Sequence, residues 1–381
     1  MSTFQLQTAI DVATAAGGGI VEVPLGVHSI KTTIHVQQVR GLIIRGHGAI
    51  ATDLRWAGPP NVPMFRFRRT QGCYLEQLSI SARAAAPLLE GVRIDQGPGD
   101  PYKPRANLPS SLMTVRSVIF SGRNALGTAI RVHLENVAKD TKNDHHRFER
   151  LQITGCTYAG LVLEGRNAKA IDLDQVVVAG EVCRYGVLTV ANCSPMSLNP
   201  DGTPGQIGDP AVNGGNPVYN HGASFTAIGG QLAGNTVANV YIGDRNDELV
   251  LQGIYSEKSA RWLVVPDYGT GSAGAFPVKM VGCRYSKNKN TPGDFEIVQF
   301  YADGPLEIDT CRFGQRQPGE QLRIRYEPKV APGTFSMRNS SISNDGDGNV
   351  FVAEPPSNPD YVFVNRGYRA GQHSRLGLAK T

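Results

Sequence analysis

Acidic residues recur at one position of a repeated six-residue pattern, and this recurrence is the clearest chemical signal in the sequence. In FERLQI and LDQVVV the second residues are Glu149 and Asp174, and the residues just before the two patterns are Arg147 and Asp172. Carboxylates on adjacent strands repel each other, so one tends to keep its proton, and glycoside hydrolysis needs such an acid beside a nucleophile or base. Glu149, Asp174 and Asp172 are therefore candidate catalytic residues, with Arg147 as a substrate ligand. The same four residues also fit an exposed charge ladder that Arg147 balances.

Histidines in two loops offer a different chemistry. His145 and His146 end the loop KDTKNDHH just before FERLQI, and Tyr219 and His221 lie in a long segment rich in Gly, Pro and Asn at 194–222. An imidazole can take the proton in β-elimination of a uronic acid polymer. All four are candidate substrate ligands. Spacing fixes no partner for any of them, so an ordinary loop role also fits.

Thiol and metal chemistry are not indicated. The six cysteines contain no CxxC pair, so we expect buried free thiols rather than a zinc module or a disulfide scaffold. Cys283 and Cys311 occupy equivalent pattern positions and should stack in the core, with Arg284 and Arg312 beside them as an exposed pair. NDGDGN at 344–349 lacks the glycine position of an EF-hand loop and is interpreted as a turn. No metal or other cofactor is expected.

A repeat along the chain predicts how these residues are positioned. Its pattern is an apolar residue, two variable positions, an apolar residue or cysteine, one variable position and a further apolar residue. Copies starting at 148 and 173 lie 25 residues apart, and those at 251, 280, 308 and 337 follow one another at 29, 28 and 29 residues. A degraded copy is expected around 227–232, and two copies depart from the pattern at Ser256 and Ser340. The copies are LEQLSI (75–80), VRSVIF (115–120), FERLQI (148–153), LDQVVV (173–178), LQGIYS (251–256), MVGCRY (280–285), IDTCRF (308–313) and MRNSSI (337–342).

Each copy is followed by a second short strand, such as AGLVLEG, YGVLTV or QLRIRY. A period of this length with at least two strands returns the chain to its starting edge about one strand spacing (~4.8 Å) higher, which stacks the strands in parallel. The prediction is an all-β fold, a single-stranded right-handed parallel β-helix with a short capping helix in LQTAIDVATAA. A β-sandwich is the alternative, but its strand spacing is usually shorter and lacks a common period.

We expect one β-helix domain over residues 1–355, with the N-terminal cap in 1–40 and the long insertion at 194–222. The tail at 356–381 is basic and is expected to leave the coil. The end rungs of a coil expose unpaired backbone groups, and prolines separate the tail from the coil. Both ends of the coil therefore need cover, which favours a homotrimer or a docked partner.

Composition excludes several classes of protein. Hydrophobic residues make up 40% of the 381 and charged residues 19%, enough apolar material for a sizeable core. The formal charge of +5 is spread along the chain, so neither a nucleic-acid partner nor a membrane partner is expected. No signal peptide and no long apolar span are visible. Glycine and proline, at 44 and 24 residues, indicate many turns between short strands.

The opening AIDVATAAGGGIVEVPLGVHSI, followed by GLIIRGHGAIATDL, resembles the start of pectate-lyase-superfamily β-helices, which include bacteriophage tailspikes and polysaccharide depolymerases. The motif resemblance covers about the first 55 residues. The Gly46-His47-Gly48 triplet is similar to the Gly-His-Gly of polygalacturonases, but no Asp-Asp pair or Arg-Ile-Lys follows, and the Arg-x-Pro-x-x-Arg of pectate lyases is absent. The triplet is interpreted as a turn.

The resemblance implies a phage tailspike-like or tail-associated protein that binds a bacterial surface polysaccharide, with or without cleaving it. Its location would be a virion tail or the extracellular space, and its partners a polysaccharide and other virion proteins. Two alternatives remain: a structural virion protein without catalysis, and a secreted polysaccharide lyase or glycoside hydrolase.

Overall fold

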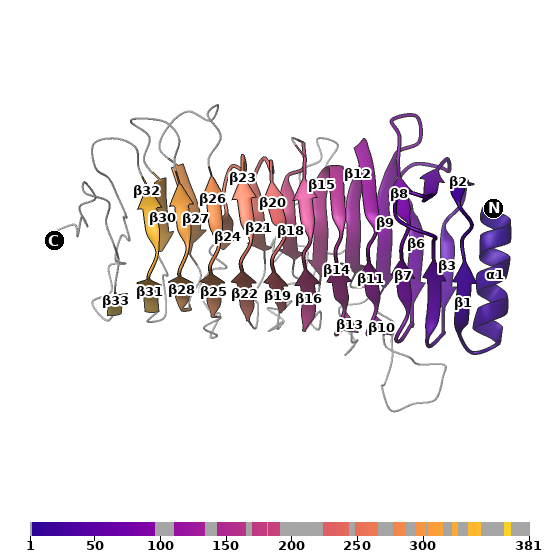
Figure 1. Cartoon of the computed structure of the whole chain (residues 1–381), viewed down its shortest axis with the longest axis horizontal. Helices are drawn as coiled ribbons and strands as arrows, with labels where there is room; N and C mark the ends of the chain where they lie inside the picture. Colours follow the sequence, from indigo (N-terminus) through magenta and orange to yellow (C-terminus); the bar gives the residue numbers. More distant parts are fainter. Residues whose placement is uncertain are drawn as a thin grey trace, which may run out of the picture.

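The chain winds as a right-handed coil of parallel strands with helix α1 (Thr3–Ala15) at one end (Figure 1). The computed structural model describes residues 2–95, 110–133, 143–164, 170–180, 182–190, 224–243, 248–265, 277–286, 295–301, 304–314, 322–326, 334–343 and 362–366. The predicted fold class, a mostly-β solenoid with one short N-terminal helix, is confirmed. No helix among the described residues has the length and apolarity to cross a membrane.

The first of three walls is a 12-stranded sheet in which each strand pairs with its counterpart in the next turn of the coil. We call one turn a rung. In order, the strands are β1 (Gly19–Glu22), β4 (Leu42–Arg45), β7 (Tyr74–Glu76), β11 (Thr114–Arg116), β14 (Arg147–Glu149), β16 (Ile171–Asp174), β19 (Phe225–Ile228), β22 (Leu249–Gln252), β25 (Val278–Val281), β28 (Leu306–Asp309), β31 (Thr334–Arg338) and β33 (Val362–Arg366).

Two further walls close the coil, and two long strands run through both of them. The second wall holds β2 (Gly26–Ile30), β5 (Thr52–Trp56), β8 (Ser79–Ser81), β12 (Ile119–His133), β15 (Gln152–Glu164), β17 (Val177–Ala179), β20 (Gln231–Ala233), β23 (Tyr255–Glu257), β26 (Arg284–Ser286), β29 (Arg312–Gly314) and β32 (Ser341–Ser343). The third wall holds β3 (Ile34–Gln37), β6 (Pro63–Arg68), β9 (Leu88–Asp95), the distal parts of β12 and β15, β18 (Tyr185–Val190), β21 (Ala238–Gly243), β24 (Leu263–Val265), β27 (Phe295–Phe300) and β30 (Leu322–Tyr326). A short pair, β10 (Ser110–Ser111) and β13 (Asn143–Asp144), lies apart.

The repeat predicted from the sequence is the register of the first wall. The first residues of the patterns stack on one another as a buried column inside the coil, and Ala227 fills the step of the degraded copy between Leu173 and Leu251. The other members of the column are Leu75, Val115, Phe148, Met280, Ile308 and Met337. The five described cysteines are buried and free, as expected, and Cys193 lies outside the described residues.

The bend between the first and second walls has the same backbone geometry after nine strands of the first wall, from β7 to β31. Its first residue has a positive φ. After β7 to β28 this residue also donates its backbone N–H to a carbonyl of the next rung, as Gly282 does to Asp309 at 2.9 Å. The second residue is buried in most of these bends, as Cys283 and Cys311 are. The bend residues with positive φ are Gln77, Ser117, Arg150, Gln175, Gly229, Gly253, Gly282, Thr310 and Asn339.

Helix α1 covers the N-terminal end of the coil. Ser2 and Gln5 form a capping box, with Gln5 N–H donating to Ser2 Oγ at 3.3 Å and Ser2 N–H to Gln5 Oε1 at 2.7 Å. The side chains of Leu6 and Ile10 are fully buried. The helix ends before Gly18, where a Cβ would lie 2.3 Å from the Arg40 carbonyl, so only glycine fits.

Two features differ from the expected layout. β33 pairs with β31 in parallel, so the coil extends beyond the boundary expected at residue 355 and includes Val362–Arg366.

The departure from the repeat at Ser256 also has a cause: this buried hydroxyl accepts a hydrogen bond from Asn239 Nδ2. Asn239, Asn235 and Ser259 complete a buried polar group at this level of the coil.

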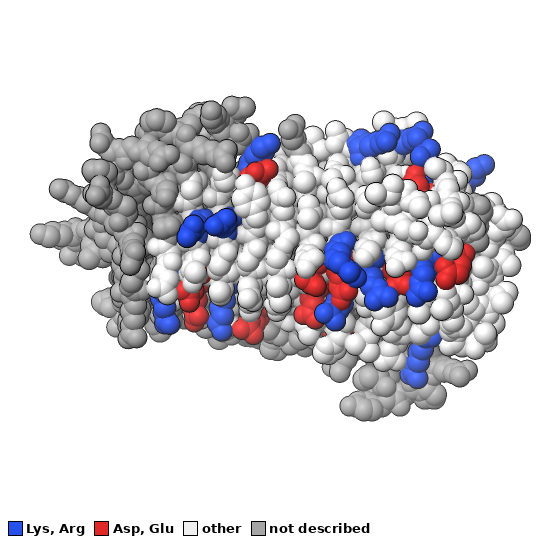
Figure 2. Space-filling model, in the orientation of Figure 1, with Lys and Arg blue, Asp and Glu red and all other residues white. Residues whose placement is uncertain are grey.

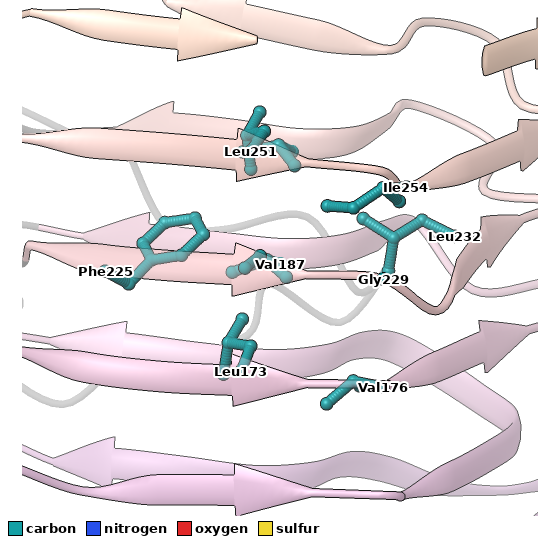
Figure 3. Close-up of a pocket in the computed structure, with 10 residues that line it drawn as sticks. Leu173, Val176, Val187, Phe225, Gly229, Leu232, Leu251 and Ile254 are labelled. Atoms are coloured by element: carbon teal, nitrogen blue, oxygen red, sulfur yellow. The ribbon is translucent and has the colours of Figure 1, made fainter. Parts of the chain in front are cut away.

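The degraded rung leaves a small apolar void inside the coil (Figure 3). Its volume is about 10 Å³, and Ala227 and Gly229 line it together with larger side chains such as Phe225, Leu173 and Leu251. That volume suits about one water molecule, which this lining could not hydrogen-bond. The void is a packing defect rather than a ligand site.

Candidate functional site

Charges of alternating sign follow the outer face of the first wall. The strand register stacks Glu22, Arg45, Glu76 and Arg116 at the same outward position of successive rungs. Arg45 lies 3.7 Å from Glu22, and both Arg45 and Arg116 contact Glu76 at 2.5 Å. Burial raises the pKa of Glu76, but hydrogen bonds from the two arginines hold it below its ordinary value. Figure 2 shows the resulting row of blue and red side chains.

The candidate carboxylates continue this row. β14 and β16 pair so that Glu149 lies beside Asp174 and Arg147 beside Asp172, the register expected from the sequence. All four point outward: Arg147 and Asp172 are exposed, and Glu149 and Asp174 are partly exposed. Arg147 Nε contacts Glu149 Oε1 at 2.5 Å. Among the described residues Asp172 and Asp174 form no ion pair, so the alternation of sign stops here.

The two histidines beside this group separate. His145 has a positive φ and an exposed side chain. His146 is fully buried, stacks on Phe148, and accepts a hydrogen bond at Nδ1 from Met113 N–H at 3.2 Å. Burial, with a smaller contribution from the charge of His145, lowers the pKa of His146 to about 3. His146 therefore faces the core and does not reach the outer surface as a substrate ligand would. Tyr219 and His221 lie outside the described residues.

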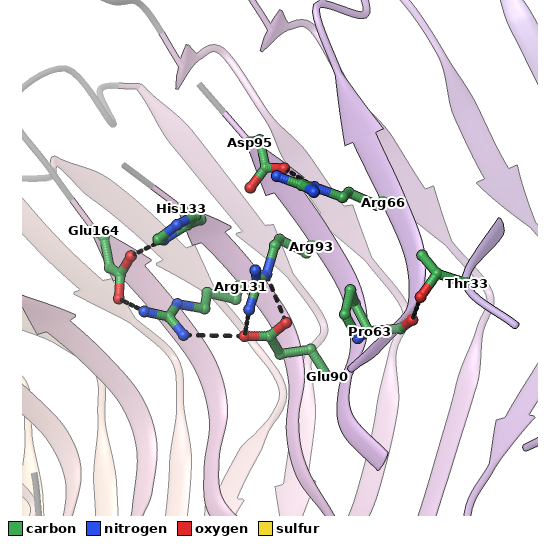
Figure 4. Close-up of polar contacts among 9 residues, drawn as sticks. All are labelled: Thr33, Pro63, Arg66, Glu90, Arg93, Asp95, Arg131, His133 and Glu164. Carbon is green, nitrogen blue, oxygen red and sulfur yellow. Dashed lines mark hydrogen bonds and ion pairs between the residues drawn. The ribbon is translucent and has the colours of Figure 1, made fainter. Parts of the chain in front are cut away.

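A second group of charged residues lies on the third wall (Figure 4). The candidate residues predicted from the sequence do not include it. Arg93 binds Glu90 through two hydrogen bonds of 2.7 and 2.9 Å, and Arg131 donates to Glu90 at 3.0 Å. Arg131 also donates to Glu164, and His133 Nδ1 lies 2.6 Å from the other oxygen of Glu164. A further pair, Arg66 with Asp95, adjoins this group.

This charge network is deeply buried. The side chains of Glu90 and Glu164 are 1% and 0% exposed, and that of Arg131 is 10% exposed. Burial opposes the charge of Glu164, but Arg131 and His133 outweigh it and lower its pKa to about 2. The Glu164 carboxylate fixes the orientation of the His133 ring, as a buried carboxylate does for a functional imidazole.

The signal for the network was present in the sequence. LLEGVRID, TAIRVH and LVLE carry charged residues between apolar ones on consecutive rungs. The six-residue pattern covers the first wall and the bend that follows it, so it does not predict which charges of the third wall meet. In the described part of the chain, no three His, Cys, Asp or Glu side chains gather as metal ligands.

The second wall carries two arginines that form no ion pair with any residue the structure describes. Arg284 and Arg312 lie directly opposite each other on β26 and β29, and both are exposed, as expected from the sequence. Figure 2 shows basic side chains standing on a largely uncharged part of this face.

Comparison with known proteins identifies relatives by structure alone. No protein-family model matches the sequence, and no curated protein matches it significantly. The catalytic domain of a GH87 α-1,3-glucanase, solved with tetrasaccharides, superposes with a TM-score of 0.53 at 10% identity over 92% of this chain. The chain spans 64% of that glucanase domain's length.

A second solved structure is similar over most of its own length. The A-module of the mannuronan C-5 epimerase AlgE6 from Azotobacter vinelandii superposes with a TM-score of 0.51 at 13% identity, covering 98% of this chain and 93% of the module. At such identities these likenesses concern the fold, and with the parallel walls, the bends and the cap they lead to one conclusion. The chain is a right-handed parallel β-helix, the fold that it shares with these two proteins.

Proposed function

We propose that this protein binds an extended bacterial surface polysaccharide along the outer face of its first wall and cleaves it beside Glu149, Asp172 and Asp174. The observation that carries the proposal is the register of β14 and β16, which brings three outward carboxylates onto two adjacent rungs. The β-helix neighbours, an α-1,3-glucanase and a mannuronan epimerase, support a carbohydrate ligand.

Contacts within the group suggest separate roles for the carboxylates. Arg147 contacts Glu149 and would hold this carboxylate in place as a nucleophile or base. Asp174 has no such partner in the described structure and suits the general acid. Arg147 would also contact the sugar, since it is more than half exposed at 57%. His145 lies at the edge of the same group.

The test is a screen of the purified protein against capsular, exopolysaccharide and uronate polymers, following both new reducing ends and the absorbance of unsaturated products. On a polymer that is cleaved, Glu149→Gln and Asp174→Asn should each lower turnover by a factor of about 10² to 10⁴. Asp309→Asn is the matched control, because Asp309 continues the same outward column four rungs beyond Asp174. Full activity in both site variants would remove the catalytic assignment.

A second candidate function is a structural virion protein without catalysis. The alternating charges from Glu22 to Glu149 favour it, because they give Glu149 an ion-pairing role like that of Glu76. In that case no polymer would be cleaved, and Glu149→Gln would change only stability, by less than about 1 kcal/mol.

Localisation in a phage tail or the extracellular space follows from the proposed substrate, which lies outside the bacterial cell. Assembly as a homotrimer, or docking onto other virion proteins, is part of the same proposal. A secreted lyase or hydrolase would share the site and would differ in the products that the screen detects.

A further inference from the structure

Arg284 and Arg312 form a pair of like charges that the fold holds close together. They are register partners on β26 and β29, so they stand about one strand spacing (~4.8 Å) apart on the outer face. Their backbone N–H groups donate to Ile254 and Cys283, both at 2.9 Å. Like charges directly opposite each other on neighbouring strands are destabilising. The pair therefore lowers the stability of the protein when no ligand is bound.

Two other pairs of arginines in the described structure share a buried carboxylate. Arg45 and Arg116 share Glu76, and Arg93 and Arg131 share Glu90. Arg284 and Arg312 form no ion pair among the described residues, and both are exposed. An anion from outside the chain would supply the missing charge.

The neighbouring position of the same outward column is aromatic. Tyr255 is the register partner of Arg284 on the preceding rung, its side chain is partly exposed, and its hydroxyl donates to Glu257 Oε2 at 2.8 Å. The column therefore runs from an aromatic ring to two guanidinium groups. Aromatic rings pack against the apolar faces of sugars, and guanidinium groups bind carboxylate, sulfate or phosphate through paired hydrogen bonds.

We propose that Arg284 and Arg312 form a binding site for the anionic groups of an acidic polysaccharide, with Tyr255 beneath an adjacent sugar ring. One rung rises by about 4.8 Å, comparable with the length of one sugar residue, so a polymer lying along the coil axis can place successive acid groups over the two arginines. The inference deepens the proposed function by naming the substrate class, and it rests on that function only for the ligand being a polysaccharide.

The arginine pair lies a short distance along the coil from the proposed catalytic residues Glu149, Asp172 and Asp174. The outward column of the first wall continues from Asp174 through Ile228, Gln252 and Val281. Arg284 follows Val281 in the same rung but lies on the second wall, past the bend. The pair therefore begins three rungs from Asp174 along the coil axis, about 14 Å at one strand spacing per rung. A polymer that contacts both the arginine pair and Asp174 would have its acid groups bound a few sugar residues away from the glycosidic bond that is cleaved. At Asp174 itself, the carboxylate would repel an acidic sugar.

The test measures binding of two matched polymer pairs: polygalacturonate with its full methyl ester, and dextran sulfate with dextran. We expect the protein to bind the acidic member of a pair more tightly, and less so at high salt. Arg284→Gln/Arg312→Gln should weaken that binding about tenfold or more, since a hydrogen bond to a charged group is worth about 1.5–3 kcal/mol. Binding of the neutral member should not change.

Lys279→Gln is the matched control, since Lys279 lies in the same rung as Arg284 but is ion-paired to Glu248 at 3.6 Å. It removes one positive charge, as each of the single variants Arg284→Gln and Arg312→Gln does, and should leave binding within about twofold. The double Arg→Lys variant keeps the charge without the paired geometry and should show an intermediate loss.

Equal binding of acidic and neutral polymers, or a loss in Lys279→Gln equal to that in the arginine variant, would overturn this site while leaving the proposed function standing. Competition by free sulfate as effective as dextran sulfate at equal sulfate concentration would overturn the assignment to a polymer. Failure to bind any polymer would overturn the proposed function as well.

Discussion

At the scale of single residues, Arg131 has the largest expected effect on stability. It is the shared partner of Glu90 and Glu164, both almost fully buried. Arg131→Met keeps much of the side-chain volume but leaves two buried carboxylates with less compensation, and we expect a loss of about 3–5 kcal/mol in the free energy of unfolding. Urea unfolding at pH 7 measures it. Arg147→Met, which removes an exposed ion pair, should cost less than about 1 kcal/mol.

His146 should make the protein sensitive to mild acid. Its pKa is lowered to about 3 in the folded protein against 6.5 ordinarily, so between these values the unfolded chain binds a proton that the folded chain does not. Stability therefore falls as the pH drops below 6.5, by up to about 1.4 kcal/mol per pH unit. Glu164 adds a further loss from about pH 4.5 to 2, since its lowered pKa stabilises the fold above that window.

The measurement is the free energy of unfolding at pH 6.5 and at pH 5. His146→Met loses the hydrogen bond to Met113 and should be less stable at pH 6.5, but its stability should fall less between the two values, by up to about 2 kcal/mol. His145→Gln, with its exposed side chain, should keep the pH dependence of the original protein. If His146→Met shows the same slope, the buried imidazole is not its source.

Part of the site could be predicted at this scale. The juxtaposition of Glu149 and Asp174 followed from equal positions in a repeat. Strand alternation places His146 on the same side as Phe148 and so indicates its burial, whereas the polar sequence KDTKNDHH predicts an exposed loop. The Glu90, Arg131 and Glu164 network depends on which rungs pair in the third wall, and irregular segments between the strands obscure that spacing.

At the scale of the elements, the bends between the first and second walls have the most testable geometry. Gly282 has a φ of +64°, and an added Cβ would meet no atom within 4 Å. Gly282→Ala therefore introduces backbone strain without a clash, and we expect it to cost about 1–2 kcal/mol in the free energy of unfolding. Gly314→Ala is the control, because the φ of Gly314 is not in the left-handed region and its Cβ would meet only the Tyr285 carbonyl at 3.6 Å.

The elements of the first wall were predictable because inward apolar residues recur in one six-residue pattern, spaced 25 to 29 residues apart where no long insertion separates the copies. The bends were harder to predict from the sequence, because Arg150, Gln175 and Thr310 adopt a positive φ although they are not glycine. The hydrogen bond that each donates to the next rung explains this geometry, and such a contact between rungs is not a local property of the sequence.

At the scale of the whole molecule, the coil depends on the cover at its N-terminal end. Ile10 of α1 is fully buried, whereas Val12 is 66% exposed. Ile10→Ala should cost about 2–5 kcal/mol. Because each rung contacts mainly its neighbours, the loss should begin locally. Hydrogen exchange should quicken first in β1, β2 and β3 and leave β25 and β28 protected, whereas Val12→Ala should change neither region.

The assembly of the molecule stays a prediction. A trimer would be seen by light scattering as a mass near three times the 41.0 kDa of one chain. A mass of one chain that does not change with concentration would contradict it. In that case the cap formed by α1 is sufficient cover for its end of the coil.

The stacking of rungs also determines how the molecule would respond to force. The hydrogen bonds that join successive rungs run roughly along the coil axis, and none of the described strands runs from one end of the molecule to the other. Tension between the two ends would therefore break the hydrogen bonds between one pair of rungs at a time. The coil would unfold one rung after another. Compression along the axis would press every rung onto the next. The same molecule should therefore resist compression along its axis well and tension along its axis poorly.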